Sequence, residues 1–178
     1  MRFLIASDVH GSSFYAKQLL ELVKKEKADK LILLGDIYNH GPRNPFPKDY
    51  NPGEVANMLN SIKENLIVIK GNCDSQVDTL ISEFDFLEGL CIVENEKTVY
   101  FTHGHVYNKD KETVTKFDAV VYGHFHTGFI ERKGDTLYAN AGSISLPKNG
   151  TPNSYIILED GVLTLKDLSG EIIKKEQI

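Results

Sequence analysis

The side chains that could do chemistry in this chain gather in five short polar motifs. The motifs are Asp8-Val9-His10, Gly35-Asp36, Gly71-Asn72-Cys73-Asp74, His103-Gly104-His105 and Gly123-His124-Phe125-His126. The sixth histidine, His40, follows Asp36 by four residues. Carboxylate, amide and imidazole groups are the ligands that hard and borderline divalent cations accept. The motifs therefore predict a metal site that holds more than one ion.

Each motif follows, within one residue, an apolar run that is typical of a β-strand. These runs are residues 3–6, 31–34, 66–69, 99–101 and 119–122. Residues at the carboxyl ends of several strands converge on the functional crevice of an α/β sheet, so separate motifs can build one site. Alternation along a strand also puts Asp8 and His10 on the same side, where they can share one ion.

The first half of the sequence is predicted to alternate strands and helices. Residues 13–26 form an amphipathic helix, and residues 37–53 form a proline-rich loop. Asn51 and Pro52 fit the N-cap and first position of a second helix, and Ser75 fits the cap of a short one. From residue 90 the pattern predicts short strands at 90–94, 97–102, 118–122, 128–133, 136–140, 154–159, 162–168 and 171–175. The pattern alone favours one mixed sheet covered by helices and one largely antiparallel sheet.

Length and composition indicate one globular domain over residues 1–178. The net charge of −5 argues against binding of long nucleic acids, which need clustered Lys and Arg. Two cysteines, Cys73 and Cys91, imply no disulfide framework and favour the reducing cytoplasm. No apolar run approaches the length of a membrane span, so no membrane association is expected.

In this order, the five motifs resemble those of the calcineurin-like metallophosphoesterase superfamily. The resemblance covers residues 1 to about 145. Three segments resemble the YfcE-type phosphodiesterase family in particular: residues 71–75, residues 39–45 and Asn140-Ala141-Gly142-Ser143. The resemblance implies an α/β fold, a four-layer α/β/β/α sandwich of two mixed sheets. It also implies two divalent metal ions per chain, usually manganese.

The resemblance also implies a ligand set in which Asp36 bridges the two ions. The first ion would be held by Asp8, His10, Asp36 and His126. The second would be held by Asp36, Asn72, His103 and His124. Mn²⁺ is the expected cation, although such ligands also accept Zn²⁺, Fe²⁺, Co²⁺ or Ni²⁺. Every ligand position is filled, which favours an active enzyme.

Further residues of the motifs are predicted to serve catalysis beside Asp36 and Asn72. Cys73 stands where most of the superfamily has histidine, and a thiol with a pKa near ~8.5 is a poorer proton donor than an imidazolium. The YfcE-type family shares this cysteine, and the alternative is that Cys73 only fills space. Asp74 is expected to orient Asn72 or an imidazole. His105 either acts in the same way or contacts the phosphate.

The proline-rich loop carries two candidate substrate contacts, His40 and Arg43. Arginine suits bidentate phosphate binding. The alternatives are that Arg43 is simply solvated or that the loop forms an oligomer contact in a homodimer or homotetramer.

The predicted function is hydrolysis of a small, soluble phosphodiester by a two-metal centre. Two cations about 3.5–4 Å apart can bridge a water and lower its pKa, and the resulting hydroxide would attack phosphorus in line. One alternative is a phosphomonoesterase or nuclease on the same centre. Another, from a different class, is a non-catalytic scaffold of the same fold that binds other proteins.

Overall fold

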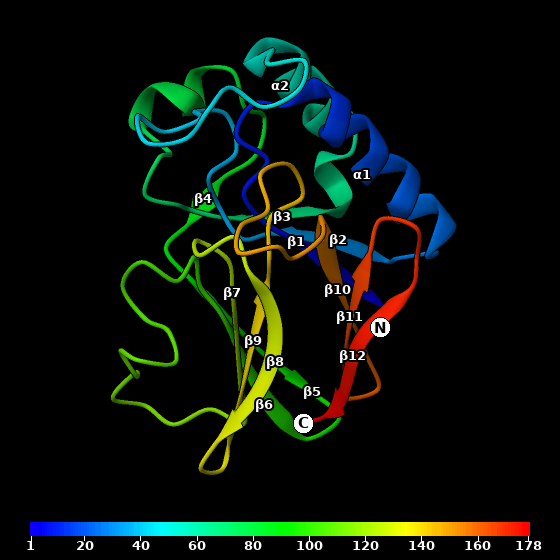
Figure 1. Ribbon diagram of the computed structural model, residues 1–178, viewed down its shortest axis with the longest axis vertical. Helices are drawn as coiled ribbons and strands as arrows, with labels where there is room; N and C mark the ends of the chain where they lie inside the picture. Colours follow the sequence, from blue (N-terminus) through cyan, green and yellow to red (C-terminus); the bar gives the residue numbers. More distant parts are fainter.

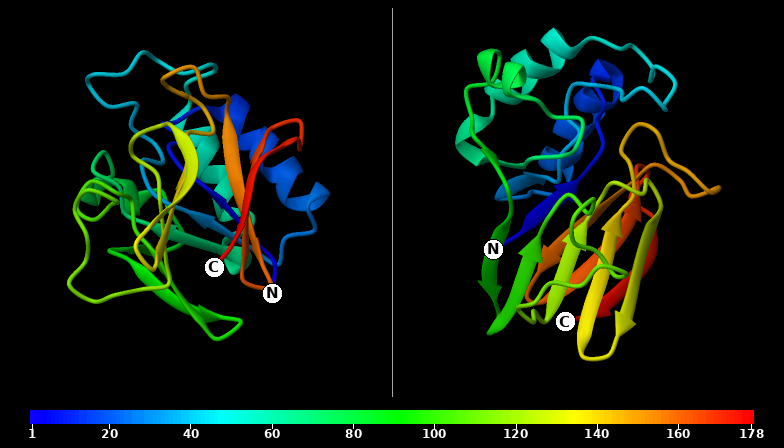
Figure 2. Two further views of the ribbon diagram at one scale, coloured as in Figure 1. Left: turned by 60° about the horizontal axis from the view of Figure 1, so that its bottom comes forward. Right: turned by 90° about the vertical axis from the view of Figure 1, so that its left-hand side faces the viewer.

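Two β-sheets packed face to face form the centre of the protein in the computed structural model, which describes residues 1–178 (Figure 1). The seven-stranded sheet has the order β12 (Ile172–Gln177), β11 (Val162–Asp167), β10 (Ser154–Glu159), β1 (Phe3–Ala6), β2 (Lys30–Leu33), β3 (Leu66–Ile69) and β4 (Phe86–Leu87). The five-stranded sheet has the order β5 (Leu90–Glu94), β6 (Lys97–Phe101), β7 (Ala119–Tyr122), β9 (Thr136–Ala141) and β8 (Gly128–Lys133). Figure 2 shows the green and yellow strands of the second sheet facing the orange and red strands of the first.

Both sheets are mixed, which confirms the two packed mixed sheets of the α/β fold expected from the resemblance. Strands β1 to β4 are parallel to one another, whereas β10, β11 and β12 are antiparallel. In the second sheet β6, β7 and β9 are parallel and the edge strands β5 and β8 are antiparallel. The expectation of a largely antiparallel second sheet was therefore wrong, because β10 to β12 join the first sheet through the β1–β10 pairing.

The two α-helices cover the outer face of the seven-stranded sheet (Figure 1). Helix α1 spans Ser13–Lys25, and the hydroxyl of Ser12 caps it by accepting from the backbone N–H of Tyr15. Helix α2 spans Pro52–Asn60, and the predicted N-cap Asn51 accepts from the N–H of Glu54. Two 3₁₀ turns, η1 (Lys63–Asn65) and η2 (Gln76–Leu80), flank β3. None of the helices is long and apolar enough to cross a membrane.

The sequence of strand β1 is a continuous apolar run because the strand is buried on both faces. Leu4 and Ala6 pack under the helices, and Phe3 and Ile5 pack against the second sheet. Strand β2 is divided between the same two cores. The outer face of the five-stranded sheet is covered by the loop of residues 102–118 instead of a helix, and Phe117 packs there against Tyr138 and its neighbours.

Candidate metal centre

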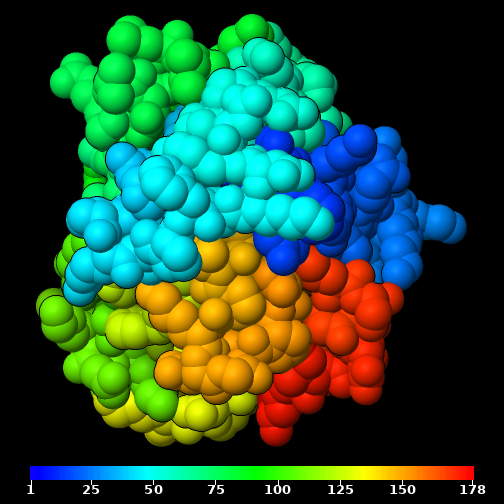
Figure 3. All heavy atoms as spheres, turned by 45° about the horizontal axis from the view of Figure 1, so that its top comes forward, coloured from blue at the N-terminus to red at the C-terminus, as the bar shows by residue number.

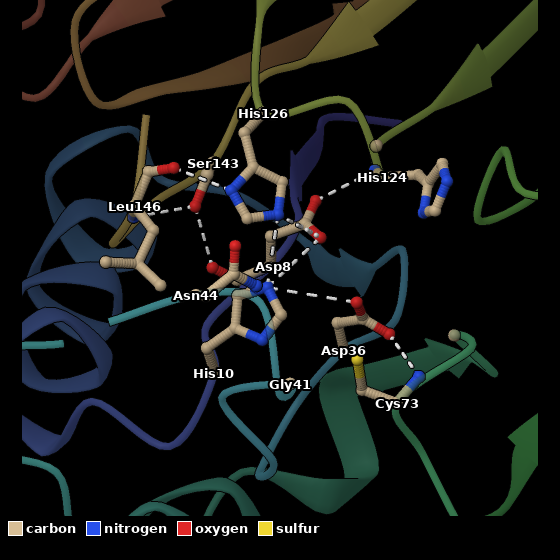
Figure 4. Close-up of polar contacts among 12 residues, drawn as sticks. Asp8, His10, Asp36, Gly41, Asn44, Cys73, His124, His126, Ser143 and Leu146 are labelled. Carbon is tan, nitrogen blue, oxygen red and sulfur yellow. Dashed lines mark hydrogen bonds and ion pairs between the residues drawn. The ribbon is translucent and has the colours of Figure 1, made fainter. Parts of the chain in front are cut away.

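The five polar motifs meet where strands β1, β2, β3, β6 and β7 end. These strands are parallel within their sheets, so their carboxyl ends lie at one edge of the sandwich. The residues of the five motifs therefore converge in space, although the first and the last, Asp8 and His126, are more than a hundred positions apart in the sequence. Figure 4 shows Asp8, His10, Asp36 and His126 pointing toward one another.

The backbone at this edge is unusual, because five of the predicted ligands have a positive φ. They are Asp8 (58°), His10 (51°), Asp36 (55°), His124 (66°) and His126 (59°). Residues with a side chain seldom adopt this left-handed conformation, and such strain concentrates at functional sites. The left-handed conformation marks the points where the chain turns after these strands, at the edge where the ligands meet.

The first group of ligand atoms contains Asp8, His10, Asp36 and His126. The Nε2 atom of His10 lies 3.6 Å from Oδ1 of Asp8 and 3.8 Å from Oδ2 of Asp36. The Nε2 atom of His126 lies 3.2 Å from Oδ1 of Asp8 and 3.2 Å from Nε2 of His10. Ligand atoms about 2.0–2.2 Å from one metal ion lie at separations of this size. All four side chains are buried.

The second group shares Asp36 with the first. Its other carboxylate oxygen, Oδ1, lies 3.4 Å from Nε2 of His103, and that nitrogen lies 3.0 Å from Oδ1 of Asn72. The carboxylate of Asp36 therefore stands between the two groups with one oxygen toward each. A bridging carboxylate has this arrangement.

Backbone carbonyls fix the orientation of three imidazoles. The Nδ1 atoms of His10, His103 and His126 lie 2.7, 2.7 and 2.6 Å from the carbonyl oxygens of Asn39, Leu34 and Leu146. A carbonyl can only accept, so each Nδ1 carries the proton. In a neutral ring the Nε2 lone pair then points into the site, which is the tautomer that a metal ligand needs.

Two observations show that these residues fit a divalent cation. The Oδ1 atom of Asp8 is buried and has no hydrogen-bond partner. The Nε2 atoms of His10 and His126 face each other at 3.2 Å although both rings donate through Nδ1. Neutral rings of this tautomer would oppose two lone pairs, and an unpaired buried carboxylate oxygen is costly. A cation among these atoms would satisfy all three.

The charges in the centre alter the pKa values of its members. Burial alone would raise the pKa of Asp8, but the contacts with His10 and His126 hold it well below its ordinary value. Burial alone would lower the pKa of His103, but Asp36 and Asp8 raise it to about 9. The centre therefore has a negative potential that stabilises positive charge.

His124 and His105 lie beside the second group without joining the close cluster. The backbone N–H of His124 donates to Oδ2 of Asp8 at 3.0 Å, while Figure 4 shows its ring turned away from Asp8. The ring centroids of His124 and His103 are 5.1 Å apart, and burial together with His103 lowers the pKa of His124 to about 4. His105 is exposed, with its centroid 5.4 Å from that of His103.

Asp74 differs from the expectation that it orients Asn72 or an imidazole. Its buried carboxylate accepts from the backbone N–H groups of Asp36, Ile37 and Gly71, at 2.8, 2.8 and 2.7 Å. These bonds tie the loop after β2 to the loop after β3. Burial raises the pKa of Asp74 to about 6. Asp74 thus positions the backbone of Asp36 rather than a ligand side chain.

Cys73 lies on the wall of the centre. Its backbone N–H donates to Oδ1 of Asp36 at 2.8 Å, and the amide of Asn72 donates to its sulfur at 3.3 Å. Burial and the charge of Asp36 raise the pKa of the Cys73 thiol to about 12. The thiol is therefore protonated at neutral pH in this geometry.

A cavity of about 620 Å³ opens beside the ligands. Its lining comprises Asp36, Asn39, Gly41, Pro42, Arg43, Asn44, Asn72, Cys73, His124, His126 and Lys148. Of the two predicted substrate contacts, Arg43 is present and His40 is not. The ring of His40 stacks on Phe46, with centroids 4.3 Å apart, and meets the edge of Tyr50. The loop sequence gave no sign that these aromatic neighbours would hold His40.

Sequence reasoning missed part of the segment that supports Asp8 and His126 through hydrogen bonds. The hydroxyls of Ser143 and Ser145 both donate to the carbonyl of Asp8 at 2.8 Å. The hydroxyl of Ser143 also accepts from the N–H of Leu146, whose carbonyl receives Nδ1–H of His126. Ser143 belongs to a segment that carried the family resemblance, but no sequence signal marked Ser145 or Leu146.

The fold and the site define a metal-dependent phosphoesterase. Residues 1–160 match the family model of the calcineurin-like phosphoesterase superfamily domain, and the chain belongs to this superfamily. It is 38% identical to phosphodiesterase YfcE of Escherichia coli (strain K12) over 175 residues, which cover 97% of this chain and 95% of that protein. A solved structure of YfcE, described as a phosphoesterase, has a TM-score of 0.95 and 35% identity, with both chains fully covered.

The chain is also similar to one more distant protein in sequence and to another in structure. The probable metallophosphoesterase YsnB of Bacillus subtilis (strain 168) is 27% identical over 168 residues, which cover 89% of this chain and 83% of YsnB. The vacuolar protein sorting protein 29 of Cryptosporidium parvum has a TM-score of 0.64 at 19% identity, with 99% and 98% of the two chains covered. The second likeness shows a common fold alone.

Proposed function

We propose that this protein is a two-metal phosphodiesterase that hydrolyses a small, soluble phosphodiester. The observation that carries the proposal is the carboxylate of Asp36, which presents one oxygen to each of two groups of ligand atoms. The similarity to phosphodiesterase YfcE supports the choice of a diester over nearly the whole chain. In this proposal all 178 residues act as one domain, because β10 to β12 complete the sheet that β1 begins.

Asp8, His10 and His126 would hold the first ion, and Asn72, His103 and His124 the second, with Asp36 shared between them. Bound divalent ions would activate water and neutralise charge on the phosphoryl oxygens. Mn²⁺ is the cation that we propose. The contribution of the chain is to hold the imidazoles in one tautomer and to exclude bulk water from Asp8.

The cavity wall supports a proposed role in the reaction for further residues. Asn72 and Cys73 line the cavity next to Asp36, so we propose that they contact the phosphate or the leaving oxygen. We propose that His105, which is exposed beside His103, contributes less to the reaction than Asn72 and Cys73. Because a protonated thiol is a weak acid, we expect faster cleavage of diesters whose leaving groups need little protonation.

The size and polarity of the cavity support a small substrate. Its volume of about 620 Å³ suits a small molecule, and most residues in its lining are polar or charged. The net charge of −5 disfavours long nucleic acids. We also propose a cytoplasmic location, because Cys73 and Cys91 are both free thiols.

The test is hydrolysis of bis(4-nitrophenyl) phosphate and of 4-nitrophenyl phosphate by chelator-treated protein, with and without Mn²⁺. We expect Mn²⁺ to restore diester cleavage with little monoester cleavage. Asp36→Asn should abolish it, whereas Asp135→Asn, in the exposed β8–β9 turn, should not. Dominant monoester cleavage would favour a phosphomonoesterase. Turnover that survives in Asp36→Asn would refute the two-metal proposal, and inactivity of folded, metal-loaded protein would favour a scaffold.

A further inference from the structure

The cavity beside the metal centre contains two cationic side chains, Arg43 and Lys148. Neither charged group has a carboxylate partner among the ion pairs of the structure, whereas many other Lys and Arg side chains do. The only acidic residue in the lining is Asp36, which faces the predicted ligands. Two unpaired cations in one cavity of a chain with net charge −5 are therefore available to an anionic ligand.

Arg43 is positioned by the loop that also orients His10. The carbonyl of Asn39 accepts from Nδ1 of His10 at 2.7 Å. A turn then closes around Arg43, because the N–H of Asn44 donates to the carbonyl of Gly41 and the amide of Asn44 donates to the carbonyl of His40. The path of this loop is therefore tied to a predicted ligand of the first ion.

Lys148 is positioned by the loop that orients His126. The carbonyl of Leu146 accepts from Nδ1 of His126 at 2.6 Å, and the N–H of Lys148 donates to the carbonyl of His126 at 2.9 Å. The N–H and hydroxyl of Thr151 both donate to the carbonyl of Lys148, which closes the turn. Figure 3 shows this loop, in orange, against the blue and cyan loop that carries Arg43.

We propose that Arg43 and Lys148 form a second anion-binding subsite for the substrate. The substrate is then a small phosphodiester in which one ester arm carries a further phosphate or carboxylate group. This inference rests on the proposed function, because the metal centre must bind the phosphodiester itself. A guanidinium binds phosphate or carboxylate through two parallel hydrogen bonds, and an ammonium adds a point charge. Most residues of the lining are polar or charged, which favours an anionic arm over an apolar one.

The kinetic test uses two matched substrates, the 4-nitrophenyl phosphodiesters with a 3-phosphopropyl or a 3-hydroxypropyl arm. We expect the Mn²⁺-loaded protein to prefer the phosphorylated arm in kcat/KM. Lys148→Gln and Arg43→Gln should each reduce this preference by about tenfold, equivalent to about 1.4 kcal/mol. Lys175→Gln removes the same charge from the exposed strand β12 and should leave the preference unchanged. An equal preference in Lys148→Gln, Arg43→Gln and Lys175→Gln would overturn the subsite.

A binding measurement separates failure of the subsite from failure of the proposed function. Calorimetry would compare propylphosphonate with 1,2-ethane-, 1,3-propane- and 1,4-butanediphosphonate on Mn²⁺-loaded protein, which needs no turnover. We expect at least one diphosphonate to bind about tenfold more tightly than the monophosphonate, and this advantage to disappear in Lys148→Gln. Equal binding of all four probes would overturn the subsite even in an active enzyme. A Lys148-dependent advantage in a protein that hydrolyses no diester would support the subsite and reject the proposed reaction.

Discussion

Gly71→Ala is expected to disable the metal centre although Gly71 is not a ligand. A Cβ atom at this position would lie 2.2 Å from Oδ1 of Asp36 and 2.4 Å from its backbone nitrogen. Non-bonded heavy atoms prefer separations of about 3.5–4.0 Å, so the loops after β2 and β3 must move apart by about 1 Å. The carboxylate that faces both ligand groups moves with them. The same movement would stretch the hydrogen bond from the backbone N–H of Gly71 to Oδ2 of Asp74, which is 2.7 Å long.

The size of the expected loss of activity follows from how little displacement of its ligands a metal site tolerates. Metal–ligand distances are held within about 0.2 Å, and a misplacement of about 1 Å can reduce a rate about 10²-fold. We therefore expect Gly71→Ala to lose about two orders of magnitude in Mn²⁺-dependent diester hydrolysis and to bind Mn²⁺ more weakly. The two readouts should change together, because both depend on the position of Asp36.

The assay compares kcat/KM, Mn²⁺ titration by calorimetry and unfolding in urea for Gly71→Ala and Gly53→Ala. Gly53 lies in the first turn of α2, and a Cβ there would have its nearest neighbour, Oδ1 of Asn51, at 3.8 Å. Gly53→Ala should retain activity and gain up to about 1 kcal/mol of stability. Folded Gly71→Ala protein with kcat/KM within about threefold of the wild type would refute the steric reasoning.

Three further predictions concern charge and metal. Burial alone would raise the pKa of Glu26, but hydrogen bonds from Lys166, Tyr155 and Arg2 lower it to about 2. Glu26→Gln should therefore reduce the free energy of unfolding by about 2 kcal/mol at pH 7. This difference from the wild type should vanish as the pH falls from about 4.5 to 2, and urea titrations at each pH would measure it. An undiminished difference at pH 2 would contradict this account. Asp74→Ala leaves three backbone N–H groups without their acceptor and should reduce the free energy of unfolding by about 3 kcal/mol or more. A loss below about 1 kcal/mol in urea would show that water replaces these bonds. Mn²⁺ at about 100 times its dissociation constant should stabilise chelator-treated protein by about 2.7 kcal/mol, measured by urea unfolding, and no shift would exclude binding to the folded state alone.

The elements that the sequence predicted well are those specified by neighbouring residues. Asn51 and Pro52 begin helix α2 as predicted. Strands β10 and β11 follow the predicted ranges 154–159 and 162–168 to within one residue, and Asp160 and Gly161 between them have the φ values of 53° and 73° that a two-residue hairpin turn requires. The assignment of strands to sheets failed because β10 pairs with β1 across some 150 residues. Hydrophobic periodicity gives no information about which distant strand is the partner.

In the candidate site, too, the sequence predicted some features and not others. The motifs and their positions after strands were readable, because side-chain type and strand order are properties of the sequence. Asp74 could be placed near the centre, but its backbone partners could not. His40 and Lys148 show most clearly what the sequence could not predict. His40 lies in the loop that carried the family resemblance, but its ring packs on Phe46. Lys148 belongs to no motif, yet it lines the cavity.

The carbonyls that orient the imidazoles would couple the geometry of the predicted ligands to the proposed selection of substrate. A carbonyl can come from any residue type, so no pattern marks Leu34, Asn39 or Leu146. The orientation of His10 and His126 therefore depends on the path of the loops, not on their side chains. Those two loops also carry Arg43 and Lys148 into the cavity. Under the proposed anion subsite, a change that remodels either loop for another substrate is expected to move a predicted metal ligand as well. Altered specificity without altered metal affinity would then require substitutions that leave these backbone hydrogen bonds in place.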